Sequence, residues 1–391
     1  MDKKTLSILK FTVRWGIAVF GILYVISKMS WHDRVWAVPP GDNAPVWMTV
    51  VGESSQENDA TFPVIDPRDG KTMELPRRAI VALPNHPRLE IGVIRMVRQA
   101  NPRWLFAGLA VFPLTIFITS FRWHELLKAL DIRLPLARTF VLNMVGLFFS
   151  TFMLGSTGGD VLKAYYVAKQ THHRTRAVMS VVVDRVIGLI ALIILGGSMA
   201  SLQWQIHKCR QVAVSSLAIL ACTALGLILF YNPRLRRVSG LDFVISKLPM
   251  QKQVEKAIET MHIYGKRPLL LLGALVSSFP VHAVVITSAM LCGWAFALPI
   301  KTFYYWMAVP VIVLAGSIPI SPQGAGVMEY FAINLLQPQG VTVGQAFALT
   351  MSIRLTQMLW NLSGGIFVFR GGYHAPTESE RKEVAREDVE E

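Results

Sequence analysis

Two glycine-containing runs hold residues whose types and spacing could bind an anion. The first is Gly158-Gly159-Asp160, with Lys163 following, and it continues the apolar stretch FFSTFMLGST. A helix that begins at Val161 would present free backbone N–H groups and a positive dipole end to a phosphate. Together with Ser156, these residues form the first half of a candidate substrate site. The alternative is that Asp160 serves only as the N-cap of that helix.

The second run is SPQGAGVME at 321–329, which supplies Ser321, Gly324, Gly326 and Glu329 to the candidate site. Its proline ends the incoming apolar stretch and its glycines allow a turn. Because a carboxylate flanked by apolar residues is costly in lipid, Glu329 must be paired or face a polar cavity. The alternative to a substrate role is a buried ion pair with Arg354 or Arg185.

Three further charges complete the candidate site: Asp184, Arg185 and Arg354. Arg185 and Arg354 lie about nine and thirteen residues into apolar stretches, and charges at such depth are functional candidates by default. Arginine suits phosphate because its planar fork donates two parallel hydrogen bonds. We expect Asp184 to pair with its neighbour Arg185.

Other polar residues in apolar surroundings receive structural interpretations. We expect His282 to be a packed, hydrogen-bonded side chain, and Arg122, Trp123 and His124 to anchor a helix at the membrane edge. The three cysteines, Cys209, Cys222 and Cys292, lack the CxxC spacing of a metal or redox site and are interpreted as packing residues.

No enzyme signature is present: the sequence contains no GxSxG, HExxH, P-loop or CxxC motif. We therefore expect no cofactor, no metal and no enzymatic activity. A membrane-embedded lipid transferase that uses Asp160 or Glu329 as a base stays open as an alternative.

Composition identifies an integral membrane protein. Of the 391 residues, 52% are hydrophobic and 16% charged, and mean hydropathy is +0.43, whereas soluble domains carry about 25% charged residues. The net charge of +14 accompanies no nucleic-acid-binding signature, so we expect no nucleic-acid partner. Eight apolar stretches are roughly long enough to cross the bilayer. They lie at about 11–27, 103–121, 139–157, 177–203, 211–231, 268–298, 303–321 and 342–369.

The distribution of lysine and arginine assigns the connecting segments to two sides. Lysine and arginine together number four in 1–14, four in 122–138, four in 160–176 and eight in 232–267. The segments 204–210, 299–302 and 336–345 contain only two, one and none. The positive-inside rule places the four basic-rich segments in the cytoplasm. Since 122–138 and 160–176 share a side, 139–157 must enter the membrane and turn back, and 303–336 must do the same from outside. Six crossings and two re-entrant hairpins follow, with both termini cytoplasmic.

Segments outside the apolar stretches complete the organisation. Residues 1–27 form a first transmembrane helix, and 28–102 form an extracytoplasmic β-rich insert that ends in an amphipathic helix. Repeat 1 spans 103–203 and repeat 2 spans 268–369. Between them, 204–267 hold a linking helix and an amphipathic cytoplasmic segment at 244–264. The polar tail 370–391 is predicted to be disordered.

Weak internal similarity supports the two repeats. ITSFRWHELLKAL at 118–130 aligns with ITSAMLCGWAFAL at 286–298, an offset of 168 residues. GGDVLKAY at 158–165 aligns with GAGVMEYF at 324–331, an offset of 166, and Arg185 aligns with Arg354, an offset of 169. Because the proposed topology orients the copies oppositely, they form an inverted repeat. In such folds the binding site lies near the midplane, where broken helices meet.

The same motifs resemble a known family. The Gly-Gly-Asp run, then Asp-Arg-x-x-Gly at 184–188, then Ile-Pro-x-Ser-Pro-x-Gly-x-Gly-x-x-Glu at 318–329, are similar to the lysylphosphatidylglycerol synthase transmembrane-region family, over about 100–370. This is the flippase-like membrane domain of the multiple peptide resistance factor and of many stand-alone proteins. The insert 28–102 departs from the family's core pattern. The soluble synthase domain is also missing, so we expect no synthesis of that lipid.

The resemblance implies a flippase-like protein of the bacterial cytoplasmic membrane that moves a phosphate-bearing, and in some members aminoacylated, lipid between leaflets. A membrane phospholipid is then its partner. The alternative is an accessory or scaffold subunit that holds lipid statically and recruits a lipid-modifying glycosyl- or aminoacyl-transferase.

Overall fold

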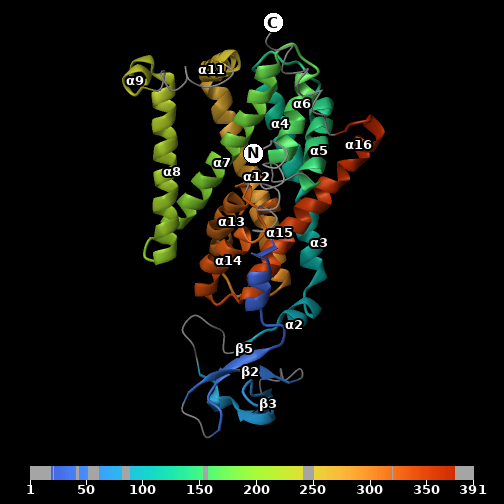
Figure 1. The fold of residues 1–391 in the computed structure, drawn as a ribbon, viewed down its shortest axis with the longest axis vertical. Coiled ribbons are helices and arrows are strands. Elements are labelled where there is room, and N and C mark those ends of the chain that lie inside the picture. Colours follow the sequence, from blue (N-terminus) through green and yellow to red (C-terminus); the bar gives the residue numbers. More distant parts are fainter. Residues whose placement is uncertain are drawn as a thin grey trace, which may run out of the picture.

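A small β-sheet and a larger helical body stand end to end along the long axis of the computed structural model (Figure 1). The structure describes residues 19–20, 22–40, 44–51, 61–81, 89–152, 157–240, 251–318 and 320–374. The predicted helix at 1–27 lies mostly outside these residues, as do the first part of the 244–264 segment and most of the 370–391 tail. The helical fold class and the β-rich insert are confirmed.

Five antiparallel strands in the order β4-β3-β2-β1-β5 form the sheet. Alternate residues point inward, as expected for a strand with one buried face, and Val35, Met48, Val64 and Leu75 form its core. The strands are β1 (Arg34–Ala37), β2 (Val46–Val50), β3 (Thr61–Ile65), β4 (Thr72–Pro76) and β5 (Leu89–Glu90), with a short 3-10 turn η1 (Arg77–Ala79) after β4.

The short helix α2 (Val93–Arg98) joins the sheet to the helical body. Asp33 accepts hydrogen bonds from the Gly92 backbone N–H at 2.8 Å and from Arg95 Nη1 at 2.6 Å, which fixes the start of α2 to the sheet. On its other side, a Cβ built on Gly344 would lie 2.8 Å from Val93 Cγ2, so α2 packs closely on the helix that begins there. This helix confirms part of the amphipathic segment predicted before the second span.

Repeat 1 contains two long helical stretches and a hairpin of shorter helices between them. Pro113 divides the first stretch because it has no backbone N–H to continue the ladder, and α5 then packs along α6. The elements are α3 (Pro102–Val111), α4 (Pro113–Lys128), α5 (Leu136–Phe152), α6 (Thr157–Ala168) and α7 (Arg174–Ser201).

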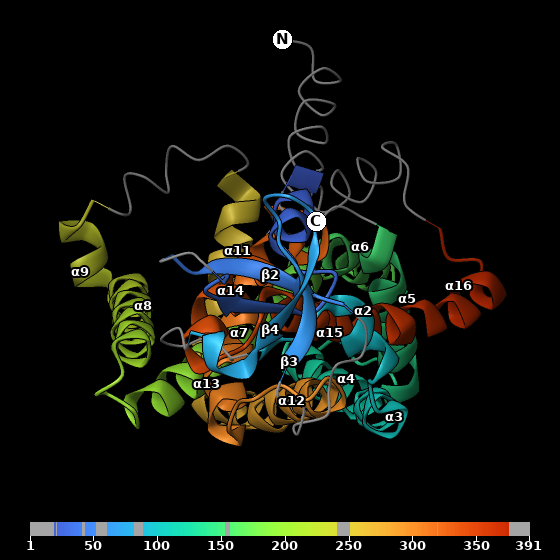
Figure 2. The same ribbon diagram turned by 90° about the horizontal axis from the view of Figure 1, so that it is seen from below.

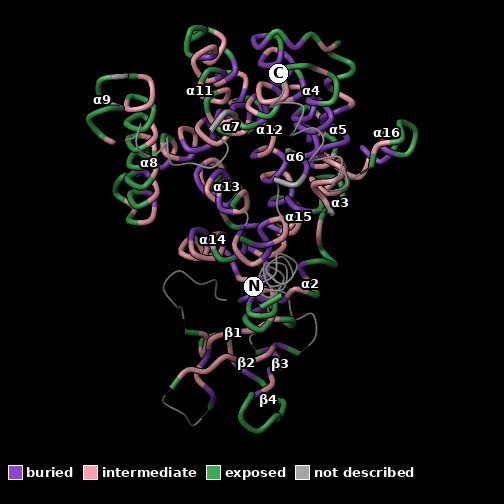
Figure 3. The backbone as a smooth tube through the Cα atoms, turned by 45° about the horizontal axis from the view of Figure 1, so that its top comes forward, coloured by how far each residue is buried: buried purple, intermediate pink, exposed green. Residues whose placement is uncertain are grey.

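The linking region places one helix at the side of the body. Helix α8 packs along α7 at the side of the body (Figure 2) and is otherwise largely exposed (Figure 3). The two described helices that follow α8 in the sequence, α9 and α11, lie at the end of the molecule opposite the sheet (Figure 1). These elements are α8 (His207–Tyr231), α9 (Pro233–Val238) and α11 (Gln251–Gly265).

Repeat 2 has the same order of elements. A long helix precedes a hairpin of two shorter ones, α13 packs on α14, and a further helix follows. The elements are α12 (Pro268–Ala295), α13 (Thr302–Ser317), η2 (Pro322–Gly324), α14 (Val327–Leu336), η3 (Gln337–Gln339), α15 (Val343–Ser363) and α16 (Gly365–Gly371).

The connecting segments gather at the two ends as the charge pattern predicts. At the basic end, Tyr264 donates to the Leu126 carbonyl at 3.0 Å and Arg176 pairs with Glu259 at 3.3 Å. At the sheet end, the Asn101 N–H donates to the Ala295 carbonyl at 3.0 Å. The α5–α6 hairpin lies in the upper half of the body and α13–α14 in the lower half (Figure 1). Re-entry into a membrane stays a prediction.

Among the described residues, four helical stretches are long and apolar enough to cross a bilayer: Pro102–Lys128, Arg174–Ser201, His207–Tyr231 and Pro268–Ala295. The predicted single span at 342–369 differs, because α15 ends at Ser363 and α16 begins at Gly365. Polar residues lower the hydropathy of α15, and several of them line a cavity described below. The count of six crossings therefore stays a prediction.

The hairpin of repeat 1 depends on a glycine contact. A Cβ on Gly159 would overlap the Gly146 carbonyl oxygen and lie 2.8 Å from Ser150 Cβ, whereas a Cβ on Gly226 of α8 would meet nothing within 4 Å. We expect Gly159→Ala to lower the stability of the purified protein by about 1–3 kcal/mol, because α5 and α6 must separate.

The matched variant Gly226→Ala should raise stability by about 0.5–1 kcal/mol, since it only improves helix propensity. Thermal unfolding in detergent checks both variants. Equal shifts for the two would contradict the close packing of α5 on α6.

Candidate functional site

A cavity of about 270 Å³, lined by both polar and apolar side chains, lies where the two hairpins meet the long helices. Its walls come from both repeats, which agrees with the prediction that the broken elements converge. Its polar lining consists of Arg122, Ser150, Asp184, Arg185, His282, Ser317, Gln323, Gln357 and Asn361.

Asp160 forms an ion pair with Arg185 at the edge of this cavity. Helix α6 begins at Thr157 rather than Val161, so Asp160 lies inside the first turn, and the alternative of an N-cap before Val161 is wrong. Lys163 Nζ lies 3.9 Å from Asp160 Oδ1, one turn along the same helix. Asp160 therefore has a cation on each of two sides.

Arg185 makes a second contact with the other hairpin. Its Nη2 donates to the Ser317 carbonyl oxygen at 3.3 Å, at the last residue of α13. Because the last carbonyls of a helix have no partner within the helix, this guanidinium stabilises the end of α13. Arg185 thus joins α6, α7 and α13, which come from both repeats.

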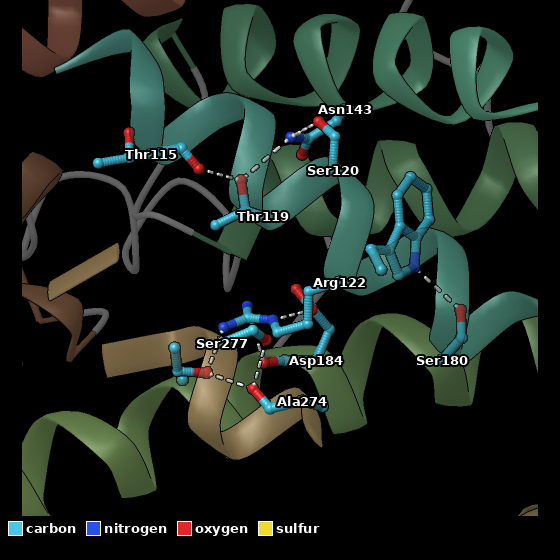
Figure 4. A network of polar contacts seen from close by, with 12 residues as sticks. Thr115, Thr119, Ser120, Arg122, Asn143, Ser180, Asp184, Ala274 and Ser277 are labelled. Carbon is cyan, nitrogen blue, oxygen red and sulfur yellow. Dashed lines mark hydrogen bonds and ion pairs between the residues drawn. The ribbon is translucent and has the colours of Figure 1, made fainter. Parts of the chain in front are cut away.

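The structure contradicts the prediction that Arg122 anchors a helix at the membrane edge. The side chain is buried, its Nε donates to Asp184 Oδ1 at 2.7 Å, and its Nη1 donates to Ser278 Oγ at 2.6 Å. Figure 4 shows this network of α4, α7 and α12. Trp123 and His124 are also buried, at 1% and 8% exposure, so the anchoring interpretation is wrong for all three.

The predicted pair of Asp184 with Arg185 is also wrong. Successive residues of an α-helix point about 100° apart, so Asp184 reaches α4 while Arg185 reaches α6. His282 is hydrogen-bonded as expected, with Nε2 2.9 Å from the Gly188 carbonyl oxygen, and it also lines the cavity.

Glu329 pairs with Arg354, the first of its two predicted partners. Arg354 Nη2 and Thr350 Oγ1 donate to Glu329 Oε1 at 2.7 and 3.0 Å, and the Gly326 N–H donates to Oε2 at 2.7 Å. The Glu329 side chain is 0% exposed. Its carboxylate therefore caps α14 and neutralises Arg354 at the same time.

The two ion pairs occupy equivalent places in the two repeats but differ in exposure. In each, an acid on the second hairpin helix meets an arginine 25 residues later on the next helix. Asp160 thus corresponds to Glu329 at an offset of 169, whereas the sequence alignment matched it with Gly326. The side chains of Asp160 and Arg185 are each 26% exposed, against 0% and 10% for Glu329 and Arg354. We call the first pair open, because both of its side chains are partly exposed, and the second pair sealed.

The remaining predicted residues shape the hairpins. Gly324 and Gly326 have φ of +69° and +83°, and a Cβ on Gly324 would overlap Gly316 Cα, so both positions require glycine. Ser321 is buried. Gly158 and Gly159 belong to the first turn of α6, and Ser156 lies outside the described residues.

Several cavity residues escaped the sequence analysis. Gln323 Nε2 donates to the Thr151 carbonyl oxygen at 3.2 Å and so links the ends of the two hairpins. Gln357 and Asn361 follow Arg354 by three and seven residues, which places them on one face of α15. That polar periodicity inside an apolar stretch was the signal that could have found them.

Comparison with known proteins agrees with this architecture. The family model for the lysylphosphatidylglycerol synthase TM region matches residues 92–364. The chain belongs to this family. The match begins at α2, so the five strands lie outside it, as expected for an insert. The UPF0104 membrane protein PH1989 of Pyrococcus horikoshii is 20% identical over 303 residues, which cover 71% of this chain and 90% of that protein.

The difference in exposure between the two pairs predicts different costs of breaking them. Arg354→Met leaves the fully buried Glu329 carboxylate without its cation, and we expect a loss of about 3–5 kcal/mol in stability. Arg185→Met should cost clearly less, because Asp160 is partly exposed and keeps Lys163. Thermal or denaturant unfolding of the purified protein measures both.

A double variant supplies the control. Glu329→Gln in the Arg354→Met background should recover part of the loss, since the uncompensated charge is gone. Equal losses for Arg185→Met and Arg354→Met would contradict the division into an open and a sealed pair.

Proposed function

We propose that the protein moves a phosphate-bearing lipid between the two leaflets of the membrane. The observation that carries the proposal is the open Asp160–Arg185 pair beside a cavity that contains further charged and amide side chains, inside an apolar helical body of this family. In a bilayer, the headgroup would pass through the cavity while the acyl chains stay in hydrocarbon.

Arg185 is the proposed phosphate ligand. Its guanidinium donates to a carboxylate and a carbonyl, and a phosphodiester offers the same kind of acceptor oxygens in a geometry that favours two parallel bonds. When phosphate replaces Asp160, that carboxylate keeps Lys163 as a partner, so no uncompensated charge results. Arg122 and Asp184 line the cavity beside Arg185 and are already paired with each other.

The proposed mechanism is alternating access by the two hairpins. The equal 25-residue separation of the two pairs and the shared element order support the inverted repeat. In folds of that kind, movement of one repeat against the other exposes a central site to each side in turn. The sealed Glu329–Arg354 pair would hold α14 to α15 as one rigid unit during this movement.

The proposed orientation places the basic end in the cytoplasm and the sheet outside. Lysines and arginines concentrate in the segments around α9 and α11 and at the junctions α4–α5 and α6–α7, which meet at the end opposite the sheet (Figure 1). The positive-inside rule then gives the orientation, with the bacterial cytoplasmic membrane as the proposed location.

A leaflet assay tests the proposal. The full chain is reconstituted into liposomes with phosphatidylglycerol that carries a quenchable label on its acyl chain, and loss of signal on adding an impermeant quencher reports lipid in the outer leaflet. We expect movement with wild type, and Arg185→Gln should slow it roughly ten-fold or more because a charge-assisted contact is lost.

Arg176→Gln is the matched control. It removes an arginine of the same helix, α7, whose partner Glu259 is at the surface, and movement should continue at the wild-type rate. Mass spectrometry of the extracted lipids accompanies the assay. A chemically modified lipid would replace the proposal with a transferase, and no movement together with capture of a lipid-modifying enzyme would replace it with an accessory subunit.

A further inference from the structure

A second cavity, of about 400 Å³, lies between α8 on one side and α13 and α14 on the other. Each helix contributes one face to it. On α8 the spacing is that of successive turns, with Lys208, Gln211, Ser215 and Ile219. On α13 Val311 and Leu314 lie about one turn apart, and Ile318 follows directly after the helix. We call this cavity the lateral groove.

The lateral groove faces the surrounding membrane. Helix α8 packs on α7 and leaves most of its surface exposed: only 6% of its apolar window is buried. An apolar surface of this kind, on a helix long enough to span the bilayer, lies against hydrocarbon. A gap between such helices loses dispersion contacts unless lipid fills it.

Polar groups are gathered at one end of the groove. Lys208 belongs to the first turn of α8 and is half-buried, and Gln211 and Ser215 follow along the same wall. Asn334 lines the opposite wall, on α14. This end lies on the side of the sheet (Figure 1). A cation above amide and hydroxyl groups, followed by apolar walls, matches the order of phosphate, ester and acyl chain in a glycerophospholipid.

We propose that the lateral groove binds one anionic glycerophospholipid from the leaflet on the sheet side. Its phosphate contacts Lys208, and one acyl chain lies between α8 and the α13–α14 hairpin. The order of groups favours a lipid over a helix of another protein. Lys208, Gln211 and Ser215 lie together along one wall at one end of the groove, whereas the walls from α13 and α14 are largely apolar.

The end of α13 separates the lateral groove from the central cavity. Val313, Gly316 and Ser317 line the cavity, whereas Val311, Leu314, Ala315 and Ile318 line the groove. One helical wall thus has a polar site on one face and a lipid site on the other.

This wall can respond to what the central cavity holds. Pro310 interrupts the hydrogen-bond ladder of α13 before these last turns, and Arg185 holds their end through the Ser317 carbonyl. A phosphate that takes Arg185 in the cavity removes this contact. The role of the groove as a waiting position for transported lipid rests on the proposed function, but the binding itself does not.

Photo-crosslinking tests the binding without any transport. The full chain in nanodiscs receives phosphatidylglycerol with a photoreactive group on the acyl chain, and mass spectrometry maps the labelled peptides. We expect labelling concentrated on 208–219, 311–318 and 330–335. Lys208→Gln should reduce it about five-fold with phosphatidylglycerol and leave it unchanged with phosphatidylcholine.

Arg210→Gln is the matched control, because Arg210 is exposed on the same turn of α8 and does not line the groove. It should leave the labelling unchanged. Ser215→Trp, which fills the groove, should abolish the label there, and size-exclusion chromatography reports whether each variant is folded.

Three results would overturn the proposal: labelling spread evenly over all membrane-facing helices, an equal effect of Lys208→Gln and Arg210→Gln, or a crosslink from the groove to a second polypeptide. Groove labelling together with failure of the leaflet assay would keep the lipid site and reject only translocation.

Discussion

Charge compensation inside an apolar body is the constraint on which this structure depends. Two hairpins that reach the interior each carry a carboxylate, and each carboxylate is matched by an arginine from the following helix. A third pair, Arg122 with Asp184, fastens α4 to α7 and, through Ser278, to α12. Removing one partner of a buried pair leaves a charge that costs several kcal/mol. The positions of the long helices and of both hairpins are therefore fixed by the same few contacts.

The two equivalent pairs have diverged in environment. Glu329 is saturated by a backbone N–H, a hydroxyl and a guanidinium, so its contacts are complete without a ligand. Asp160 is partly exposed and lies between two cations, an arrangement in which one cation can change partners while the other stays. Under the proposed function, repeat 2 would supply the rigid half of the body and repeat 1 the half that exchanges contacts.

Sequence reasoning located the elements better than the contacts. Charge parity across 139–157 and 303–336 predicted that the chain turns back there, and the structure has a pair of shorter helices at each place, α5 with α6 and α13 with α14; their re-entry into a membrane stays a prediction. The sequence predicted an ion pair between Asp184 and Arg185 and placed Arg122 at the membrane edge, and both predictions were wrong. Those contacts depend on how α4 and α7 are rotated about their axes, and apolar stretches with little periodicity do not encode that rotation. The glycine turns at Gly324 and Gly326 were readable because positive φ demands that residue type.

The hydrogen bond from Gln323 to the Thr151 carbonyl has an energetic consequence for the two halves of the molecule. A single bond between a neutral side chain and the backbone contributes about 1 kcal/mol net, far less than the ion pairs within each half. Gln323 also has a φ of +48°, a conformation that itself costs roughly 1–3 kcal/mol outside glycine. The Gln323 contact therefore contributes little net stability, and among the described residues Arg185 makes a further contact between the two halves through the Ser317 carbonyl.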